Sequence, residues 1–326
     1  MMPGLSRLAI LDDYQGVALT RGPWDRLPEA LTIEVFRDTV TEMEALVARL
    51  LPFDAILIMR ERTPFPRALL ERLPNLRLLI TTGARNRSVD LEAAAERGVT
   101  VCGTPSFGHP TVDLTWGLIL SLMRRIPEQQ ASLRSGGWQI APGGSIGSTF
   151  EGKVLGVMGL GNLGSRVAKV GQAFGMEVIA WSQNLTAEKA EAAGARLVGK
   201  AQLMEEADVV SLHLILSDRS RGIVGAEELG RMKRSAFIVN TSRGPLIEQE
   251  ALITALQDGQ IAGAGIDVFD REPLPPGHPL LAAPNTVLTP HLGYVTEENY
   301  AQYFLGAVEA VEAFLAGRPI RELRAG

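Results

Sequence analysis

The sequence predicts an α/β protein in which parallel sheets are covered by helices on both faces and divided between two domains. Three observations predict this fold class. Short apolar runs alternate with amphipathic stretches in two successive blocks, and the second block opens with a glycine-rich turn between a strand and a helix. The length, 326 residues, is more than one ordinary core requires and suits two domains.

The first block is predicted to form a parallel sheet, because its short apolar runs alternate with two amphipathic helix candidates. These helices are expected at 41–50 and 90–98, the second with Asp90 near its start and Gly98 as its stop. The strands are expected at 8–11, 32–36, 54–59, 76–83 and 99–103.

The second block repeats this alternation after a long apolar helix candidate, 111–126, which ends before Pro127. A Gly- and Ser-rich stretch, 135–153, is predicted to be a surface loop. A last helix, 297–317, is long enough to return to the first block. The strands of this block are expected at 153–161, 176–181, 208–214, 236–241, 263–269 and 286–290.

This order of elements predicts two domains of different connectivity. The outer one is expected to combine residues 1–104 with residues 295–326. The inner one is expected at 105–294.

The composition excludes several kinds of partner. The net charge of −5 provides no general attraction to nucleic acid or anionic lipid, and no apolar run approaches the ~20 residues of a membrane span. The one cysteine, Cys102, excludes an internal disulfide and a multi-cysteine metal site. We therefore expect a cytoplasmic protein with no metal, nucleic-acid or membrane partner.

A glycine turn, "GLGNLG" at 159–164, lies between a predicted strand and a predicted helix. In this context Gly159 permits the tight turn, Gly161 lets the backbone approach a pyrophosphate, and Gly164 lets the helix pack against the strand. With the intervening Asn162 and Leu163, these residues open a helix whose free N–H groups would bind phosphates. A dinucleotide site is predicted; another nucleotide or a bare turn are the alternatives.

The choice between NAD and NADP stays open. An acid at the end of the second strand usually binds the ribose 2′-hydroxyl, but here Ser182, Gln183 and Asn184 occupy that position. The segment has neither a carboxylate to repel a 2′-phosphate nor an arginine to attract one. Ser182 could hydrogen-bond with either group.

Four histidines are candidates for the base that hydride transfer from an alcohol requires. His109 and His278 lie in loop segments, where exposure or a structural role is the simpler interpretation. His213 follows a predicted strand and could line the cofactor site or lie in the core. His291, in "TPHLGY", follows the last strand of the cofactor sheet. Since ligands bind beyond the carboxyl ends of such strands, it is the predicted catalytic base.

A carboxylate beside such a histidine would orient it and favour its cation. The segment "GIDVFDREPLP" offers Asp267, Asp270 and Glu272. Asp267 still belongs to the predicted strand, whereas Glu272 lies beyond it and directly before Pro273. Glu272 is therefore the predicted partner, against the alternative of a solvated loop glutamate.

An arginine leaves the tip of another strand of this sheet, in "FIVNTSRGPLI" at 237–247. Arg243 offers a planar fork that matches a substrate carboxylate, and Gly244 lets the backbone turn away. A surface arginine is the alternative. This alternative is less favoured, because Arg243, Glu272 and His291 all follow strand ends of one sheet.

Along the chain the motifs come in the order "GLGNLG", "FIVNTSRGPLI", "GIDVFDREPLP" and "TPHLGY". Together they resemble the D-isomer-specific 2-hydroxyacid dehydrogenase family over nearly the whole chain. The resemblance implies two Rossmann-like, doubly wound domains with an inter-domain cleft, and a homodimer formed by the cofactor domains. The outer domain would be a flavodoxin-like substrate domain, and the inner one a dinucleotide-binding domain. It also implies that His291 exchanges the proton, that Glu272 tunes it and that Arg243 binds the 2-oxo acid. Further residues along the cofactor would be Thr241, Ser242, Asp267, at the nicotinamide amide, and Gly293 of the "TPHLGY" motif.

The chain departs from the family pattern in the loop 81–91, which resembles the substrate loop. Ala84 and Arg85 stand where the family is glycine-rich, so the carboxylate geometry changes or an anion contact is added. Arg60 could also reach an anion, or be solvated. Asp113 replaces a common glutamate.

The predicted function is hydride transfer between NAD(P)(H) and a small 2-oxo or 2-hydroxy acid, as in glyoxylate/hydroxypyruvate reductases or 3-phosphoglycerate dehydrogenases. The alternative is a nucleotide-sensing corepressor on the same fold. A formate or phosphite dehydrogenase would keep the scaffold but needs further substrate residues. By resemblance, the C-terminal regulatory domain of many phosphoglycerate dehydrogenases is expected to be absent.

Overall fold

The computed structural model describes residues 4–139 and 146–325, so part of the predicted loop 135–153 lies outside the described residues. The chain divides into two compact units. Unit 1 comprises Met1–Gly108 and Val295–Gly326, and unit 2 comprises His109–Tyr294. Relative to the domains predicted from the sequence, unit 1 gains residues 105–108.

Unit 1 is built on five parallel strands in the order β2-β1-β3-β4-β5. This is the strand order of flavodoxin-like folds, in which ligands bind at the switch point between the first and third strands. The loops after β1, β3 and β4 therefore lie at the functional edge of this sheet. The strands are β1 (Arg7–Ile10), β2 (Thr32–Val35), β3 (Ala55–Ile58), β4 (Leu78–Thr81) and β5 (Thr100–Gly103).

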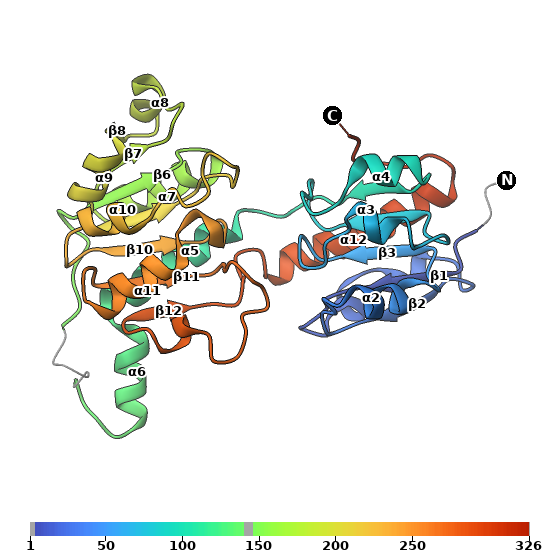
Figure 1. Cartoon of the computed structure of the whole chain (residues 1–326), viewed down its shortest axis with the longest axis horizontal. Helices are drawn as coiled ribbons and strands as arrows, with labels where there is room; N and C mark the ends of the chain where they lie inside the picture. Colours follow the sequence, from blue (N-terminus) through green and yellow to red (C-terminus); the bar gives the residue numbers. More distant parts are fainter. Residues whose placement is uncertain (1–3, 140–145, 326) are drawn as a thin grey trace. The chain divides into compact units, whose positions relative to one another are not determined.

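Helices cover both faces of this sheet. α2 (Met43–Leu50), α3 (Arg67–Leu70) and α4 (Leu91–Glu96) share one apolar cluster with the strands. α12 (Glu297–Leu315) contacts β4 and β5 and packs against α1 (Ala18–Arg21). Figure 1 shows α12, in red, among the blue elements of the first hundred residues. The predicted return of the last helix to the first block is therefore confirmed.

The seven strands of unit 2 are parallel and ordered β12-β11-β10-β9-β6-β7-β8. Counted from β6, this is the 3-2-1-4-5-6 order of dinucleotide-binding folds with one strand added. The predicted α/β class is confirmed, and the switch point lies between β6 and β9. The strands are β6 (Val154–Met158), β7 (Glu177–Trp181), β8 (Arg196–Leu197), β9 (Val209–Leu212), β10 (Phe237–Asn240), β11 (Gly263–Ile266) and β12 (Thr286–Leu288).

Two apolar clusters lie on opposite faces of the unit 2 sheet. One includes buried residues of α5 (Pro110–Arg124) and α7 (Asn162–Ala173). The other includes buried residues of α9 (Lys200–Glu206), α10 (Ala226–Arg231) and α11 (Gln249–Gln257). With both faces covered, the open edge at the carboxyl ends of the strands is the place for a site. A short helix, α8 (Ala187–Ala192), packs beside β8 at the end of the sheet.

Three elements of unit 2 differ from the prediction. The apolar helix ends at Arg124, because Arg125 adopts a left-handed conformation with φ of 55°. A second helix, α6 (Ile126–Arg134), then begins with Pro127 in its first turn, where proline is tolerated. Figure 1 shows α6 projecting away from the sheet of unit 2. The strand β8 was missed because two residues carry no periodicity.

Candidate active site

The glycine turn connects β6 to α7, and contacts with backbone atoms explain two of its glycines. Gly159 has φ of 101°, and a Cβ atom there would lie 2.7 Å from the carbonyl carbon of His213. A Cβ atom at Gly164 would overlap the carbonyl oxygen of Gly159. At Gly161, by contrast, a Cβ atom would meet nothing within 4 Å. The turn is thus closely packed against the protein at Gly159 and Gly164, and it is open at Gly161, where a phosphate needs access.

The N-terminus of α7 is suited to an anion. Gly161 is the N-cap residue, and no side chain caps the helix. The first-turn N–H groups of a helix have no partner within it, and the helix dipole adds a partial positive charge there. The helix start can therefore bind a pyrophosphate, with Asn162, Leu163 and Gly164 in its first turn.

His213 directly follows β9, at the switch point. Its backbone N–H donates to the Met158 carbonyl over 2.7 Å, and its Nε2 lies 2.9 Å from the Ser211 hydroxyl. Its Nδ1 atom is buried and makes no hydrogen bond with any described residue. Burial lowers the pKa of His213 to about 4, so the ring is neutral near pH 7. A neutral imidazole with an unused nitrogen beside the glycine turn fits a cofactor contact better than a fully satisfied core histidine.

Ser182 is the first residue after β7. The carbonyl of Trp181, the last residue of β7, accepts a hydrogen bond from the Gly159 N–H over 2.9 Å. Ser182 is half-buried and begins a turn, in which Gln183 and Asn184 are exposed. The second strand therefore ends against the glycine turn, so this segment lies where the adenosine ribose is expected.

His291 and Glu272 form a hydrogen-bonded pair. The Nδ1 atom of His291 lies 2.6 Å from Oε2 of Glu272, and both side chains are half-buried. The other carboxylate oxygen, Oε1, accepts a hydrogen bond from the Phe269 N–H over 2.9 Å. Glu272 is held from both sides, and this leaves Nε2 of His291 for exchange with a ligand.

The charge state of Glu272 follows from its neighbours. Burial raises its pKa, but the hydrogen bond and charge of His291, the Phe269 N–H and the charge of Arg243 together outweigh burial. The pKa of Glu272 consequently lies below the ordinary glutamate value. The residue is therefore ionised at neutral pH and stabilises a protonated His291. Arg243 is close enough for its charge to lower the pKa of Glu272.

Arg243 follows β10 in a tightly held turn. A Cβ atom at Gly244 would overlap the backbone of Phe269, so only glycine allows this turn to pack against the segment that leads to Glu272. The Ser242 hydroxyl donates to the Leu212 carbonyl over 2.8 Å, which ties the same turn to β9. The structure thus brings Arg243, Glu272 and His291 together, as predicted from the sequence.

Asp267 holds the His291 loop. It is fully buried and accepts hydrogen bonds from the Thr289 hydroxyl at 2.6 Å and from the N–H groups of Leu292 at 2.7 Å and Gly293 at 2.9 Å. Its backbone carbonyl accepts from the N–H of His291, whose φ of 52° is unusual for a residue other than glycine. Burial raises the pKa of Asp267, although these donors and the charge of His291 oppose the shift.

A chain of threonine hydroxyls connects the Arg243 turn to the His291 loop through α5. The hydroxyls of Thr241 and Thr115 lie 2.8 Å apart, and that of Thr115 donates to the Thr111 carbonyl over 2.7 Å. The Thr111 hydroxyl then donates to the Gly293 carbonyl over 2.9 Å. Sequence reasoning missed Thr111, Thr115 and Thr289, because these contacts join residues far apart in the chain.

In unit 1, the candidate substrate residues lie after β3 and β4. Nη1 of Arg60 donates to the Thr82 carbonyl over 3.2 Å, and its guanidinium covers Gly83 so closely that a Cβ atom there would overlap it. Ala84 and Arg85 are exposed. Arg60 and this loop therefore lie together at the carboxyl ends of β3 and β4.

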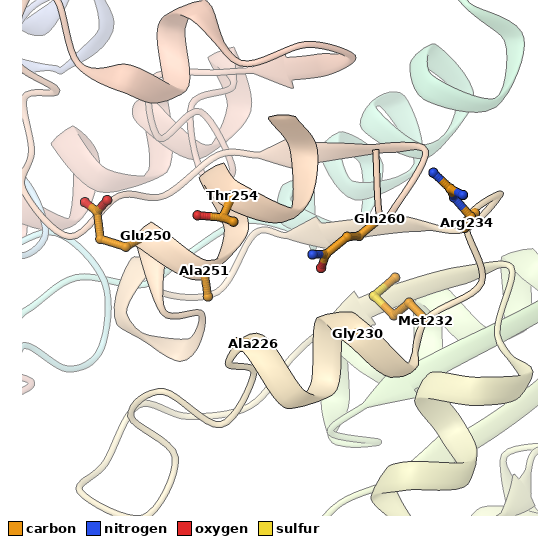
Figure 2. Close-up of a pocket in the computed structure, with 8 residues that line it drawn as sticks. All are labelled: Ala226, Gly230, Met232, Arg234, Glu250, Ala251, Thr254 and Gln260. Carbon is orange, nitrogen blue, oxygen red and sulfur yellow. The ribbon is translucent and has the colours of Figure 1, made fainter. Parts of the chain in front are cut away.

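A groove of about 590 Å³ lies elsewhere in unit 2, between α10 and α11. Figure 2 shows its lining, which includes Ala226 and Gly230 from α10 and Ala251 and Thr254 from α11. None of the predicted site residues lines this groove.

Comparisons with known proteins agree with this geometry. The family model described as "D-isomer specific 2-hydroxyacid dehydrogenase, NAD binding domain" matches residues 116–293, more than half of the chain. A glyoxylate reductase of Aeropyrum pernix is 38% identical over 256 residues, covering 77% of this chain and 76% of that protein. A hydroxypyruvate reductase of Blautia hydrogenotrophica is 32% identical over 324 residues, covering 96% and 98%.

Among solved structures, a phosphoglycerate oxidoreductase of Vibrio cholerae superposes with a TM-score of 0.90. It is 38% identical, and the match covers 96% of this chain and 99% of that one. These relatives are enzymes and do not support the corepressor alternative. The chain belongs to the D-isomer specific 2-hydroxyacid dehydrogenase family and is an NAD(P)-dependent oxidoreductase.

Proposed function

We propose that this enzyme interconverts a small 2-oxo acid, such as glyoxylate, hydroxypyruvate or 3-phosphohydroxypyruvate, and the D-2-hydroxy acid, with His291 as the proton-exchanging group. The observation that supports this most is the 2.6 Å contact between His291 Nδ1 and Glu272 Oε2, with Arg243 lowering the pKa of the same carboxyl group. Acid–base chemistry and carboxylate binding are thereby provided side by side.

A nicotinamide cofactor held by this site would supply or accept the hydride at C2 of the substrate. In the reduction, His291 donates the proton from Nε2 to the substrate oxygen as the hydride arrives, and it takes the proton back in the oxidation. Glu272 keeps the ring oriented through Nδ1 and stabilises its protonated form. Arg243 binds the substrate carboxylate with its planar guanidinium. One hydride and one proton convert the carbonyl into the alcohol.

We assign cofactor binding to the glycine turn, Ser182, Gln183, His213, Thr241, Ser242, Asp267 and Gly293. Asp267 serves this role indirectly, because its carboxylate already accepts three hydrogen bonds within the protein. Both NAD(H) and NADP(H) fit, since the segment after β7 carries no acid to exclude a 2′-phosphate.

Substrate binding is assigned to the loop after β4 as well as to Arg243. The N–H groups of Ala84 and Arg85 donate to no other residue in the described part of the chain. Backbone donors of this kind bind a carboxylate oxygen well, and the guanidinium of Arg60 adds a positive charge beside them.

The test is a panel of 2-oxo acids assayed for oxidation of NADH and NADPH, with glyoxylate, hydroxypyruvate, 3-phosphohydroxypyruvate and pyruvate. We expect turnover with at least one of them and a sharp rise in KM on Arg243→Lys, because lysine has no planar fork. Cofactor binding without turnover on any 2-oxo acid, or an unchanged KM in the variant, would contradict the proposal.

We also propose that the enzyme is a homodimer formed through α6. None of the nine residues of α6 is buried, and two of them are large and apolar: Ile126 is 49% exposed and Leu133 is 59% exposed. Trp138, shortly after the helix, is 75% exposed. Apolar side chains gathered on a projecting element are typical of an interface. Light scattering should give twice the chain mass for the native enzyme and the single mass for Leu133→Glu; a monomeric native enzyme would refute the dimer.

A cytoplasmic location is proposed on two grounds. Cys102, the one cysteine, is free and buried, as suits a reducing compartment. Among the described residues, no helix has the length and apolar character needed to cross a bilayer.

A further inference from the structure

Asn240, the last residue of β10, lies three positions before Arg243 and is 1% exposed. We propose that Asn240 is a positioning residue, whose side-chain amide holds Arg243 in the conformation that binds the substrate carboxylate. This inference rests on the role proposed above for Arg243.

Both ends of the Asn240 amide bond to the turn that carries Arg243. Its Oδ1 accepts a hydrogen bond from the Ser242 N–H over 3.0 Å, and its Nδ2 donates to the Arg243 carbonyl over 2.8 Å. Because both partners are backbone groups with fixed roles, only one orientation of the amide satisfies them. A residue with only an acceptor, or only a donor, cannot replace it.

The amide is itself anchored in the sheet. The backbone carbonyl of Asn240 accepts a hydrogen bond from the Asp267 N–H over 3.0 Å, so the residue is joined to the end of β11. Asp267 in turn binds the His291 loop through Leu292 and Gly293. Asn240 and the His291 loop are therefore both hydrogen-bonded to Asp267, so Arg243 and His291 are positioned relative to the same residue of the sheet.

Two further contacts leave Arg243 little freedom once Asn240 is in place. The Ser242 hydroxyl binds the Leu212 carbonyl on one side, and Gly244 packs against the backbone of Phe269 on the other. The N–H of Phe269 is a hydrogen-bond donor to Glu272. The turn is thus held at β9, at β10 and at the Glu272 segment. Of the two side chains that hold it, Ser242 is also assigned to cofactor binding, whereas Asn240 has no other assigned role.

Loss of the amide should therefore act on substrate binding through Arg243. Asn240→Asp keeps the acceptor for Ser242 but offers no donor to the Arg243 carbonyl, whereas Asn240→Ala removes both. We expect KM for the 2-oxo acid to rise about tenfold or more in each variant. Ile238→Val, a core substitution in the same strand, is the matched control: it should lower Tm without changing KM.

A double-mutant cycle separates this role from general support of the fold. If Asn240 acts through Arg243, the KM of Asn240→Asp combined with Arg243→Lys should be close to that of Arg243→Lys alone. Independent effects would multiply, and that result would overturn the inference. So would an unchanged KM in Asn240→Asp and Asn240→Ala while Arg243→Lys raises it. An unchanged KM in Arg243→Lys would instead contradict the proposed function itself.

Discussion

The glycine turn and the His291 cluster lie at the same edge of one sheet, yet they are built in opposite ways. The turn comes from six successive residues, 159–164, and its shape is set by backbone contacts that exclude a Cβ atom. The cluster comes from the ends of β10, β11 and β12 and is held by side-chain hydrogen bonds. The first can therefore be disrupted by one methyl group, and the second by the loss of one polar atom.

The largest effect is expected at Gly164. In Gly164→Ala the added Cβ overlaps the Gly159 carbonyl oxygen, so α7 must move and both Tm and cofactor affinity should fall. Gly161→Ala is the matched control, since its Cβ meets no protein atom within 4 Å. It should keep Tm while losing cofactor affinity, because the methyl group takes the space of the pyrophosphate. Thermal unfolding measures Tm, and NADH fluorescence measures the cofactor affinity of both variants. An unchanged NADH affinity in Gly161→Ala would show that the turn does not bind the cofactor.

The next effect is expected at Glu272. Glu272→Gln keeps the shape of the side chain but removes the charge that stabilises protonated His291, so kcat should fall by about 10²-fold. The measurement is steady-state kcat for reduction of the best 2-oxo acid, and a kcat close to the native value in Glu272→Gln would contradict the pairing.

Glu272 should also affect stability, in a direction set by its pKa. Because its folded pKa is lowered, it contributes stability above the unfolded value, about 4.3, and this contribution is lost as the pH falls through the folded value. The difference in unfolding free energy between native enzyme and Glu272→Gln should thus be present at pH 7 and shrink in acid. A constant difference across this range would contradict the assigned shift.

The smallest effect is expected at His213, which lies where the two regions meet. Its pKa of about 4 lies below the ordinary value of 6.5, so the unfolded chain binds a proton more readily. The native enzyme should therefore lose stability between pH 6.5 and about pH 4, and His213→Gln should lose less. Parallel stability curves for the two proteins over this range would exclude a buried neutral imidazole.

The contrast also explains what the sequence could predict. The glycine turn was predictable from local sequence patterns, because a strand, three glycines and a helix follow one another in the chain. The pairing of His291 with Glu272 was predictable because carboxyl ends of parallel strands meet at one edge, and their 2.6 Å contact agrees.

The supports of the cluster were not predictable. Asn240, Thr111 and Thr289 act through hydrogen bonds to particular backbone or side-chain atoms, and such bonds leave no periodic signal in the chain. The helix α6 was missed for a different reason: Pro127 was interpreted as a stop, whereas it lies in the first turn of a new helix.

The most direct test of the account is His291→Asn, because asparagine tolerates the positive φ of 52° that this position requires. NADH titration followed by fluorescence, and turnover of the best 2-oxo acid, would be measured on the same preparation. We predict an unchanged NADH Kd and a kcat reduced by about 10²–10⁴-fold. A kcat within about tenfold of the native value, with NADH affinity lost instead, would contradict the assignment of His291 as the proton-exchanging residue.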